Sequence, residues 1–179
     1  MSGLAEKILA IHRTLDRHDL AHAFGGALAL AWCTERARGT IDIDVNVFAG
    51  VDQTATVLAA LPDAVRWDDG DSALIARDGQ ARLWWDTTPV DLFLDTTDFH
   101  HHAAGRAQRR PFAGADVPFL ACEDLAVFKA FFDRTKDWAD LEEMQAAGTL
   151  DAEHVLGVLV RYLGPDDPRI ARLRDLAAG

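Results

Sequence analysis

Asp42 and Asp44 are separated by a single residue within an apolar stretch near the first quarter of the chain. Side chains two apart on a β-strand point to the same face, so we expect both carboxylates on one face, together with Asn46. The other face is expected to pack through Ile41, Ile43, Val45 and Val47. Two like charges this close repel each other unless a cation lies between them. Because Mg²⁺ is commonly held by one or two carboxylates plus substrate phosphates, the pair predicts a metal-dependent phosphoryl- or nucleotidyl-transfer site.

A third carboxylate is expected from the segment PVDLFLD at 89–95, which has the alternation of a strand. Asp91 and Asp95 share one face of that strand with Phe93, and a carboxylate in such a run is costly to bury without a partner. We therefore predict that Asp91 joins Asp42 and Asp44, either as a metal ligand or as the base for an incoming hydroxyl. Asp95 is the substitute for this role. The alternative is that Asp91 is a strand-edge residue facing water.

Gly25-Gly26 follows a short apolar strand at 20–24 and precedes a helix expected at 27–36. Glycine permits positive φ and a close approach of backbone to a ligand. Backbone N–H groups at the start of a helix form a ready site for phosphate. An ordinary strand-to-helix turn is the alternative, and the nearby aspartates favour the phosphate-binding role.

Taken together, Gly25-Gly26, a helix, Arg38-x-Thr40-x-Asp42-x-Asp44 and a later strand aspartate resemble the nucleotidyltransferase superfamily with the DNA polymerase β-like fold. Within it the pattern is most similar to AbiEii-like nucleotidyltransferases, which include toxins of toxin–antitoxin pairs. Antibiotic nucleotidyltransferases share a similar pattern. The resemblance implies an α+β fold, in which a small mixed sheet with flanking helices is followed by a helical C-terminal part.

The resemblance also implies roles for residues outside the aspartate pattern. Arg38 is expected near the phosphates and Thr40 is expected to orient the site. Lys129 lies in a helix followed by Arg-x-Lys-Asp-x-x-Asp, and by resemblance it reaches the nucleotide phosphates while Asp137 braces it. The alternatives are a solvated arginine, a threonine that starts a strand, and a snorkelling lysine within a helix-start charge network.

The resulting hypothesis is an enzyme that moves a nucleoside monophosphate from a nucleoside triphosphate to an acceptor hydroxyl. Two Mg²⁺ ions are expected on Asp42, Asp44 and Asp91. The acceptor stays open between tRNA, a protein and a small molecule such as an antibiotic, and a toxin role adds an antitoxin as a candidate partner. One alternative is a degenerate member that binds nucleotide or a partner without turnover. Another is an unrelated α/β protein, in which Asp42 and Asp91 lie far apart.

Composition bounds these hypotheses. The chain of 179 residues has 18 basic and 29 acidic residues, a net charge of −11, and such a surface repels nucleic acid on average. An RNA acceptor would need a local basic patch, and the densest candidate is Arg106, Arg109 and Arg110. The two cysteines, Cys33 and Cys122, show no disulfide or zinc spacing, so we expect buried free thiols. With no signal peptide or membrane-spanning apolar run evident, a cytoplasmic protein without membrane contact is expected.

The elements that must position these residues follow from periodicity. Apolar spacings of three and four predict a helix at 4–16, and a short helix is expected at 53–61. Asp78-Gly79 between apolar runs at 72–77 and 80–86 predicts a β-hairpin. His100-His101-His102 is expected in a solvated loop. From about Val117 the pattern becomes helical, which predicts a core at 1–116 and a helical subdomain packed on it at 117–179.

Overall fold

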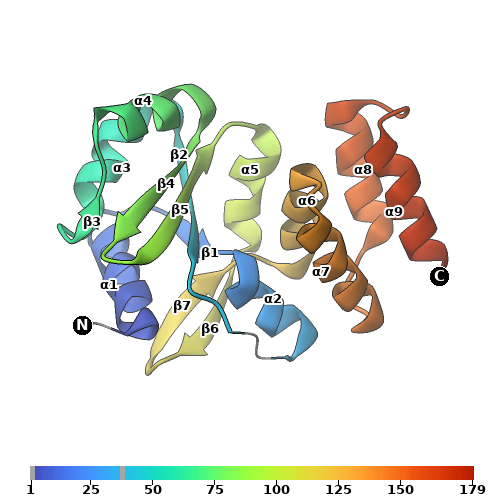
Figure 1. Ribbon diagram of the computed structural model, residues 1–179, viewed down its shortest axis with the longest axis horizontal. Coiled ribbons are helices and arrows are strands. Elements are labelled where there is room, and N and C mark those ends of the chain that lie inside the picture. The colour runs from blue at the N-terminus through green and yellow to red at the C-terminus, as the bar shows by residue number, and fades with distance from the viewer. Residues whose placement is uncertain (1–2, 37–38) are drawn as a thin grey trace. The chain divides into compact units, whose positions relative to one another are not determined.

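The computed structural model describes residues 3–36 and 39–179, and Figure 1 shows the arrangement of their helices and strands. The chain divides into two compact units. The first unit comprises Met1–Gly26 and Gly39–Leu120, and the second comprises Ala27–Arg38 and Ala121–Gly179. The predicted division into a nucleotidyltransferase core at 1–116 and a helical subdomain packed on it at 117–179 stays a prediction.

The first unit is built on a mixed sheet, which confirms the predicted fold class (Figure 1). Its strand order is β3-β4-β5-β2-β1-β7-β6. The bounds are β1 (His22–Phe24), β2 (Ile43–Gly50), β3 (Val65–Arg66), β4 (Gln80–Trp85), β5 (Thr88–Asp95), β6 (Gln108–Phe112) and β7 (Ala115–Phe119). Strands β2 and β5 pair in parallel, as do β1 and β7, while the remaining neighbours are antiparallel.

The helices of the first unit cover both faces of this sheet. They are α1 (Leu4–Arg17), α3 (Thr54–Ala60), α4 (Asp69–Asp78) and α5 (Asp98–Ala103), with short 3₁₀ turns η1 (Val51–Gln53) and η2 (Ala104–Arg106). On one face, His12 of α1 contacts His22 of β1. On the other, His100 of α5 packs edge-on against Phe48 of β2, which by strand alternation shares its face with Asp44. The carboxylates therefore lie on the α5 face of the sheet.

Alternation along β2 is largely as predicted. Ile43, Val45 and Val47 are fully buried. Ile41 was expected on the same packed face, and that prediction is wrong, because Ile41 lies in a bend before β2 begins and is 74% exposed. Period-two alternation applies only where the backbone is extended, so it fails at this position.

The predicted hairpin around Asp78-Gly79 is also wrong. Residues 69–78 form α4, whose first turn is capped by Asp68 and whose end is capped by Gly79 at φ +72°. The run Asp68 to Asp71 supplies a reciprocal capping box, and a glycine in the left-handed conformation is a common helix terminator. The hairpin lies one step further along the chain, where β4 and β5 pair from Trp85 opposite Thr88.

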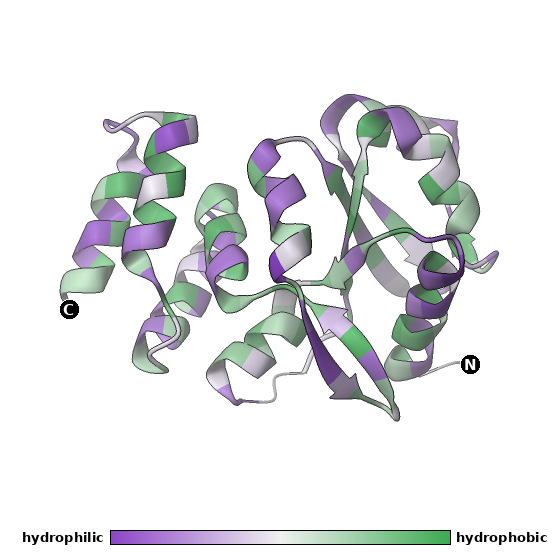
Figure 2. Cartoon of the chain, turned by 180° about the vertical axis from the view of Figure 1, so that it is seen from behind, coloured by the Kyte–Doolittle hydropathy of each residue, from purple (hydrophilic) through white to green (hydrophobic). Residues whose placement is uncertain are grey.

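The histidine and arginine runs also lie in regular structure. His100-His101-His102 was expected in a loop, but it belongs to α5, where the Thr97 side chain caps the helix by accepting from the His100 amide. Arg109 and Arg110 lie on the edge strand β6, which Figure 2 shows as a hydrophilic strand. Exposed charged residues on an edge strand oppose unwanted pairing with other chains, which gives these arginines a structural role.

The second unit is helical. It contains α2 (Gly26–Thr34), which leaves the first unit at Gly26, and α6 (Cys122–Phe132), α7 (Thr135–Ala146), α8 (Ala152–Leu163) and α9 (Pro168–Ala178). Asp151 caps α8, since its side chain accepts from the His154 amide. Among the helices of residues 3–36 and 39–179, none has the length and apolar character that crossing a bilayer requires.

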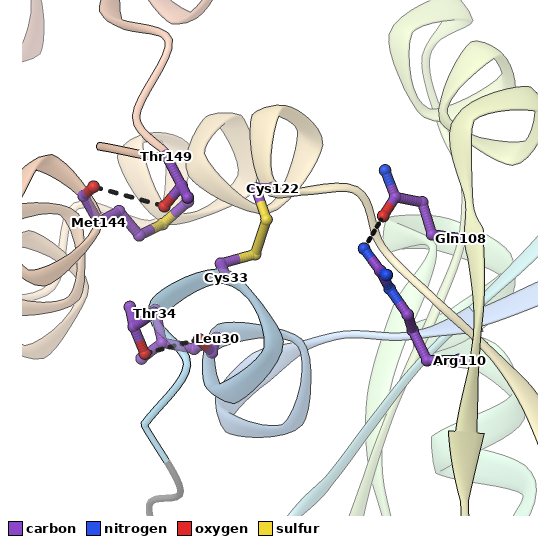
Figure 3. Close-up of a disulfide and its surroundings, with 8 residues drawn as sticks. All are labelled: Leu30, Cys33, Thr34, Gln108, Arg110, Cys122, Met144 and Thr149. Carbon is purple, nitrogen blue, oxygen red and sulfur yellow. Dashed lines mark hydrogen bonds between the residues drawn. A yellow bond between two sulfur atoms is a disulfide. The ribbon is translucent and has the colours of Figure 1, made fainter. Parts of the chain in front are cut away.

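A disulfide joins Cys33 at the end of α2 to Cys122 at the start of α6 (Figure 3). The prediction of two free thiols is therefore wrong. The two cysteines are 89 residues apart in the sequence, and this separation is not a spacing typical of a disulfide framework. Only the fold brings them together, with their Cα atoms 5.6 Å apart.

Candidate active site

Two of the three predicted carboxylates are direct neighbours across the sheet. In the parallel pairing of β2 with β5, Asp44 lies opposite Asp91. The far face of both strands is built from buried aliphatic residues, and this core fixes the register. These residues are Ile43, Val45, Val47, Val90, Leu92 and Leu94. Asp42 lies two residues before Asp44, just ahead of β2.

The Gly25-Gly26 turn lies against Asp44. The Gly25 amide donates to the Asp44 carbonyl at 2.9 Å. Gly26 has φ +54°, and a Cβ atom placed there would lie 1.9 Å from Oδ2 of Asp44. No side chain fits at such a distance, so both the backbone conformation and the contact require glycine at 26. The turn that starts α2 thus fixes the position of the Asp44 carboxylate.

Arg82 is the residue of this site that the sequence interpretation missed. It lies on β4 directly opposite Asp91. Its Nε donates to Oδ1 of Asp91 and its Nη2 donates to Oδ2, each at 2.7 Å. The same guanidinium lies 3.8 Å from Oδ2 of Asp42. Asp42 and Asp91 are therefore close together, which contradicts the alternative of an unrelated protein with the two far apart.

A correct hairpin assignment would have found Arg82. If the turn falls between Trp85 and Thr88, antiparallel pairing places residue 82 opposite residue 91. The mistaken hairpin around Asp78-Gly79 removed that register. We call Asp42, Asp44, Asp91 and Arg82 the carboxylate–arginine cluster.

The electrostatics of this cluster show how closely its members interact. The pKa of Arg82 is raised above its usual value, first by the hydrogen bonds to Asp91 and then by the charges of Asp91, Asp42 and Asp44. The guanidinium thus responds to all three carboxylates. The cluster holds three negative charges and one positive charge, so its net negative charge favours the binding of a further cation.

The donor chemistry fits a hard divalent ion, because three carboxylates are oxygen ligands of the kind that Mg²⁺ prefers. In the present arrangement, however, no group of three or more His, Cys, Asp or Glu side chains among residues 3–36 and 39–179 is placed to hold a metal ion. The bidentate contact of Arg82 with Asp91 engages both oxygens of that carboxylate. The residue types therefore suit the metal, while the side-chain arrangement is that of an internal ion pair.

The remaining predicted residues of the motif are placed as follows. Thr40 contacts the backbone of Asp42. Its hydroxyl accepts from the Asp42 amide at 3.2 Å and lies 3.3 Å from the Asp42 carbonyl. Arg38 lies outside the described residues. Asp95, the substitute third carboxylate, lies at the end of β5, where its Oδ2 is 3.2 Å from Nδ1 of His101.

Lys129 belongs to a different charge cluster, in the second unit. Its Nζ donates to Oδ2 of Asp140 at 2.5 Å and lies 3.8 Å from Oδ1 of Asp137. Arg134 holds Asp137 through its Nε at 2.6 Å and its Nη2 at 3.1 Å. We call these four residues the Lys129 cluster. Asp137 does contact Lys129, as the resemblance implied, and Asp140 is the closer partner; a contact of Lys129 with nucleotide stays a prediction.

Comparison with solved structures places this fold. The solution structure of the antibiotic-resistance factor ANT(2'')-Ia matches with a TM-score of 0.61 and 17% identity, covering 97% of this chain and 92% of that one. The lincomycin-bound lincosamide antibiotic adenylyltransferase LnuA matches with a TM-score of 0.54 and 13% identity, covering 79% and 96%. A nucleotidyltransferase-like protein from Paracoccidioides brasiliensis matches with a TM-score of 0.53 and 12% identity, covering 96% and 92%.

The chain therefore has the fold of these nucleotidyltransferases, which confirms the fold that the resemblance implied. Protein-family profiles and curated protein sequences yield no significant match. At identities of 12–17% the structural similarity establishes the fold. The closer likeness to AbiEii-like proteins stays a prediction.

Proposed function

We propose that this protein is a divalent-metal-dependent nucleotidyltransferase whose site is formed by Asp42, Asp44 and Asp91. The observation that carries the proposal is the convergence of these carboxylates beside the Gly25-Gly26 turn, on a fold shared with nucleotidyltransferases. Three carboxylates held together by a sheet register are costly unless a cation offsets them. This arrangement suits a reaction on a metal-bound triphosphate.

In the proposed reaction, an acceptor hydroxyl oxygen attacks the α-phosphorus of a nucleoside triphosphate. A new phosphorus–oxygen bond forms, the bond from the α-phosphorus to the bridging oxygen breaks, and pyrophosphate leaves with its electron pair. Bound divalent ions would offset the charge of the triphosphate and of the leaving group. Asp42 and Asp44 would hold these ions. Asp91 would share in holding them or accept the hydroxyl proton on a carboxylate oxygen.

The two glycines of the turn differ in whether their amides can contact phosphate. The Gly25 amide already donates to the Asp44 carbonyl, so Gly25 serves the turn rather than the phosphate directly. A phosphate contact would fall to the Gly26 amide, at the start of α2. Lys129 stays a predicted phosphate ligand, and Thr40 is proposed to act through the backbone of Asp42.

Among the candidate acceptors we favour a small molecule, on the basis of two similar proteins and of the net charge of this chain. ANT(2'')-Ia has been solved with adenylyl-2''-tobramycin, and LnuA has been solved with lincomycin. The net charge of −11 opposes a large nucleic-acid acceptor and favours neutral or cationic acceptors. The acceptor classes tRNA and protein, and the toxin role with its antitoxin, stay predictions.

The cytoplasmic location also stays a prediction, and the disulfide bears on it. Disulfides such as Cys33–Cys122 persist mainly in oxidising compartments and are rare in the cytosol. Counting free thiols in protein taken directly from cells, under conditions that block thiol exchange, tests which state the two cysteines adopt. Two free thiols there would agree with a cytosolic protein.

The test of the function is to incubate the protein with each labelled nucleoside triphosphate, Mg²⁺ and an acceptor panel of aminoglycosides, a lincosamide, tRNA and cell extract. We expect one acceptor class to become labelled with release of pyrophosphate. Asp44→Asn should lower the rate by about 10³-fold or more, because several kcal/mol of charge stabilisation are lost.

Asp95→Asn is the matched control, because Asp95 shares strand and face with Asp91 but contacts histidines instead. It should keep most of the activity, whereas Asp91→Asn should not. Binding of nucleotide in the presence of Mg²⁺ without any labelled product would support the degenerate alternative. Labelling that survives Asp44→Asn would refute the metal-site assignment.

A further inference from the structure

We propose that Arg82 is a built-in counter-cation, which neutralises Asp91 while the site is free of metal and competes with a divalent ion for that carboxylate. The proposal rests on the proposed metal site for its location. It goes beyond that site in assigning a function to a residue that supplies no ligand atom.

The contact geometry is the first argument. Arg82 and Asp91 are cross-strand partners, so the backbone register itself brings the guanidinium to the carboxylate. The two parallel hydrogen bonds of 2.7 Å form a bidentate pair, which is stronger and more directional than a single contact. The guanidinium also lies 3.8 Å from Asp42, so it stands between two of the three proposed ligands.

The charge of the cluster is the second argument. Without a cation, three carboxylates on adjacent strands would repel one another and weaken the parallel pairing of β2 with β5. Arg82 offsets part of that repulsion. An arginine guanidinium remains protonated in proteins, so another cation is needed to replace it at Asp91.

The exposure of the side chains is the third argument. The Arg82 side chain is 49% exposed, whereas that of Asp91 is 18% exposed. A half-exposed arginine can turn toward solvent by rotating about its side-chain bonds, without unpacking the core. The carboxylate is the fixed partner and the guanidinium the movable one, which is the arrangement that an exchange of cations requires.

The exchange has a measurable consequence. A divalent ion entering the cluster must either displace the guanidinium or accept its repulsion at short range, and both lower the affinity for the ion. Removing the positive charge should therefore make the metal bind more tightly, even though the site loses a residue. A residue that merely braces Asp91 in a metal-binding position would give the opposite result, because its loss would loosen a ligand.

The experiment is a titration of the protein with Mn²⁺ in the absence of nucleotide. Binding is monitored by calorimetry and by the electron paramagnetic resonance signal of free Mn²⁺. Arg82→Gln should bind Mn²⁺ about 10-fold more tightly than the natural protein. Arg82→Lys keeps the positive charge but cannot form the bidentate contact with Asp91. Its affinity for Mn²⁺ should lie between those of the natural protein and Arg82→Gln. Unchanged or weaker binding by Arg82→Gln would overturn the proposal.

Arg77→Gln is the matched control. Arg77 also makes a bidentate pair with an aspartate, Asp78, and it lies in the same unit on the exposed surface of α4. The control makes the same change in net charge and should leave Mn²⁺ binding unchanged. An equal gain in Arg77→Gln would show a general charge effect and would overturn the specific role of Arg82.

Thermal unfolding provides a second measurement if Arg82→Gln folds poorly. In EDTA the variant should melt at a lower temperature than the natural protein, and Mg²⁺ should restore much of the difference, because the ion takes over the neutralising role. Equal loss in EDTA and in Mg²⁺ would contradict the proposal. Failure of the natural protein and of every variant to bind Mn²⁺ would instead refute the proposed metal site, so the two failures can be told apart.

Discussion

The two charge clusters of this molecule solve the same electrostatic problem in different ways. The carboxylate–arginine cluster of the first unit has three carboxylates, one guanidinium and partly exposed side chains, with Arg82 at 49% and Asp42 at 30%. The Lys129 cluster of the second unit pairs two carboxylates with two cations. There Lys129, Asp137 and Asp140 have side chains no more than 8% exposed.

Because of this difference, we expect changes in the carboxylate–arginine cluster to affect ligand binding and changes in the Lys129 cluster to affect stability. A balanced and buried ion cluster has its charges satisfied within the protein, and breaking one partner leaves an uncompensated buried charge. An exposed cluster with excess negative charge is suited to a cationic ligand, and changes there should act mainly on function. Two substitutions, Gly26→Ala beside the first cluster and Lys129→Met within the second, test whether the clusters divide in this way.

Among changes that leave the three carboxylates intact, the largest effect on activity is expected from Gly26→Ala. An added Cβ would lie 1.9 Å from Asp44 Oδ2, at a backbone conformation that L-residues rarely adopt, so the turn or the carboxylate must move. We expect transferase activity to fall by about 10²-fold or more, because a misplaced ligand group costs that much. Steady-state kinetics with the acceptor that the labelling assay identifies provides the measurement.

Gly39→Ala is the control for that change, since nothing lies within 4 Å of the corresponding Cβ position. It should retain activity. If Gly26→Ala also retained full activity, the contact between the glycine turn and Asp44 would have no part in the reaction, and the proposed site would need revision.

The next effect is expected from Lys129→Met, in the balanced cluster. This change leaves Asp140 without its closest cation in a buried setting, so the free energy of unfolding should fall by about 3–5 kcal/mol. Chemical denaturation followed by circular dichroism measures it. The exposed Lys136→Met is the matched control and should change stability by less than about 0.5 kcal/mol.

Lys129→Met also separates its two interpretations. If Lys129 contacts nucleotide phosphates, the affinity for nucleotide should fall in the fraction of variant protein that remains folded. If its role is confined to the cluster, nucleotide affinity should stay unchanged while stability falls. A stable variant would contradict the structural role.

The smallest effect is expected from acid acting on His22 in the first unit. Burial lowers the pKa of His22 to about 4 from 6.5, and its Nε2 lies 2.8 Å from Nδ1 of His12, whose pKa burial also lowers. The unfolded chain therefore binds protons at a higher pH than the folded one. Stability should fall as the pH drops below about 6.5, and the loss should level off near pH 4.

Over that range the His22 contribution amounts to about 3 kcal/mol, and nearby Asp16 and Arg109 modify it in opposite directions. Urea denaturation at several pH values measures it. His22→Gln should flatten the pH dependence relative to the natural protein, whereas the exposed His18→Gln should leave it unchanged. A pH profile unaffected by His22→Gln would contradict a buried neutral histidine.

The sequence by itself determined the strands that carry the carboxylates and the residue types of the candidate site. The alternation around Asp44 and Asp91 predicted two strands with one carboxylate-bearing face, because a period of two is a local property of extended backbone. The Gly25-Gly26 turn and its link to the aspartates could likewise be predicted from residue type. These features supported the predicted fold, which the comparison with solved structures confirms.

Tertiary structure alone decided the partners that come from elsewhere in the chain. The cross-strand pairing of Arg82 with Asp91 depends on a hairpin register that the helix-capping residues around Gly79 concealed. The disulfide between Cys33 and Cys122 depends on two helices meeting 89 residues apart. The Arg82 pairing would have followed from a correct assignment of the local hairpin. The disulfide joins segments whose proximity is set by packing of the whole unit, which local periodicity does not encode.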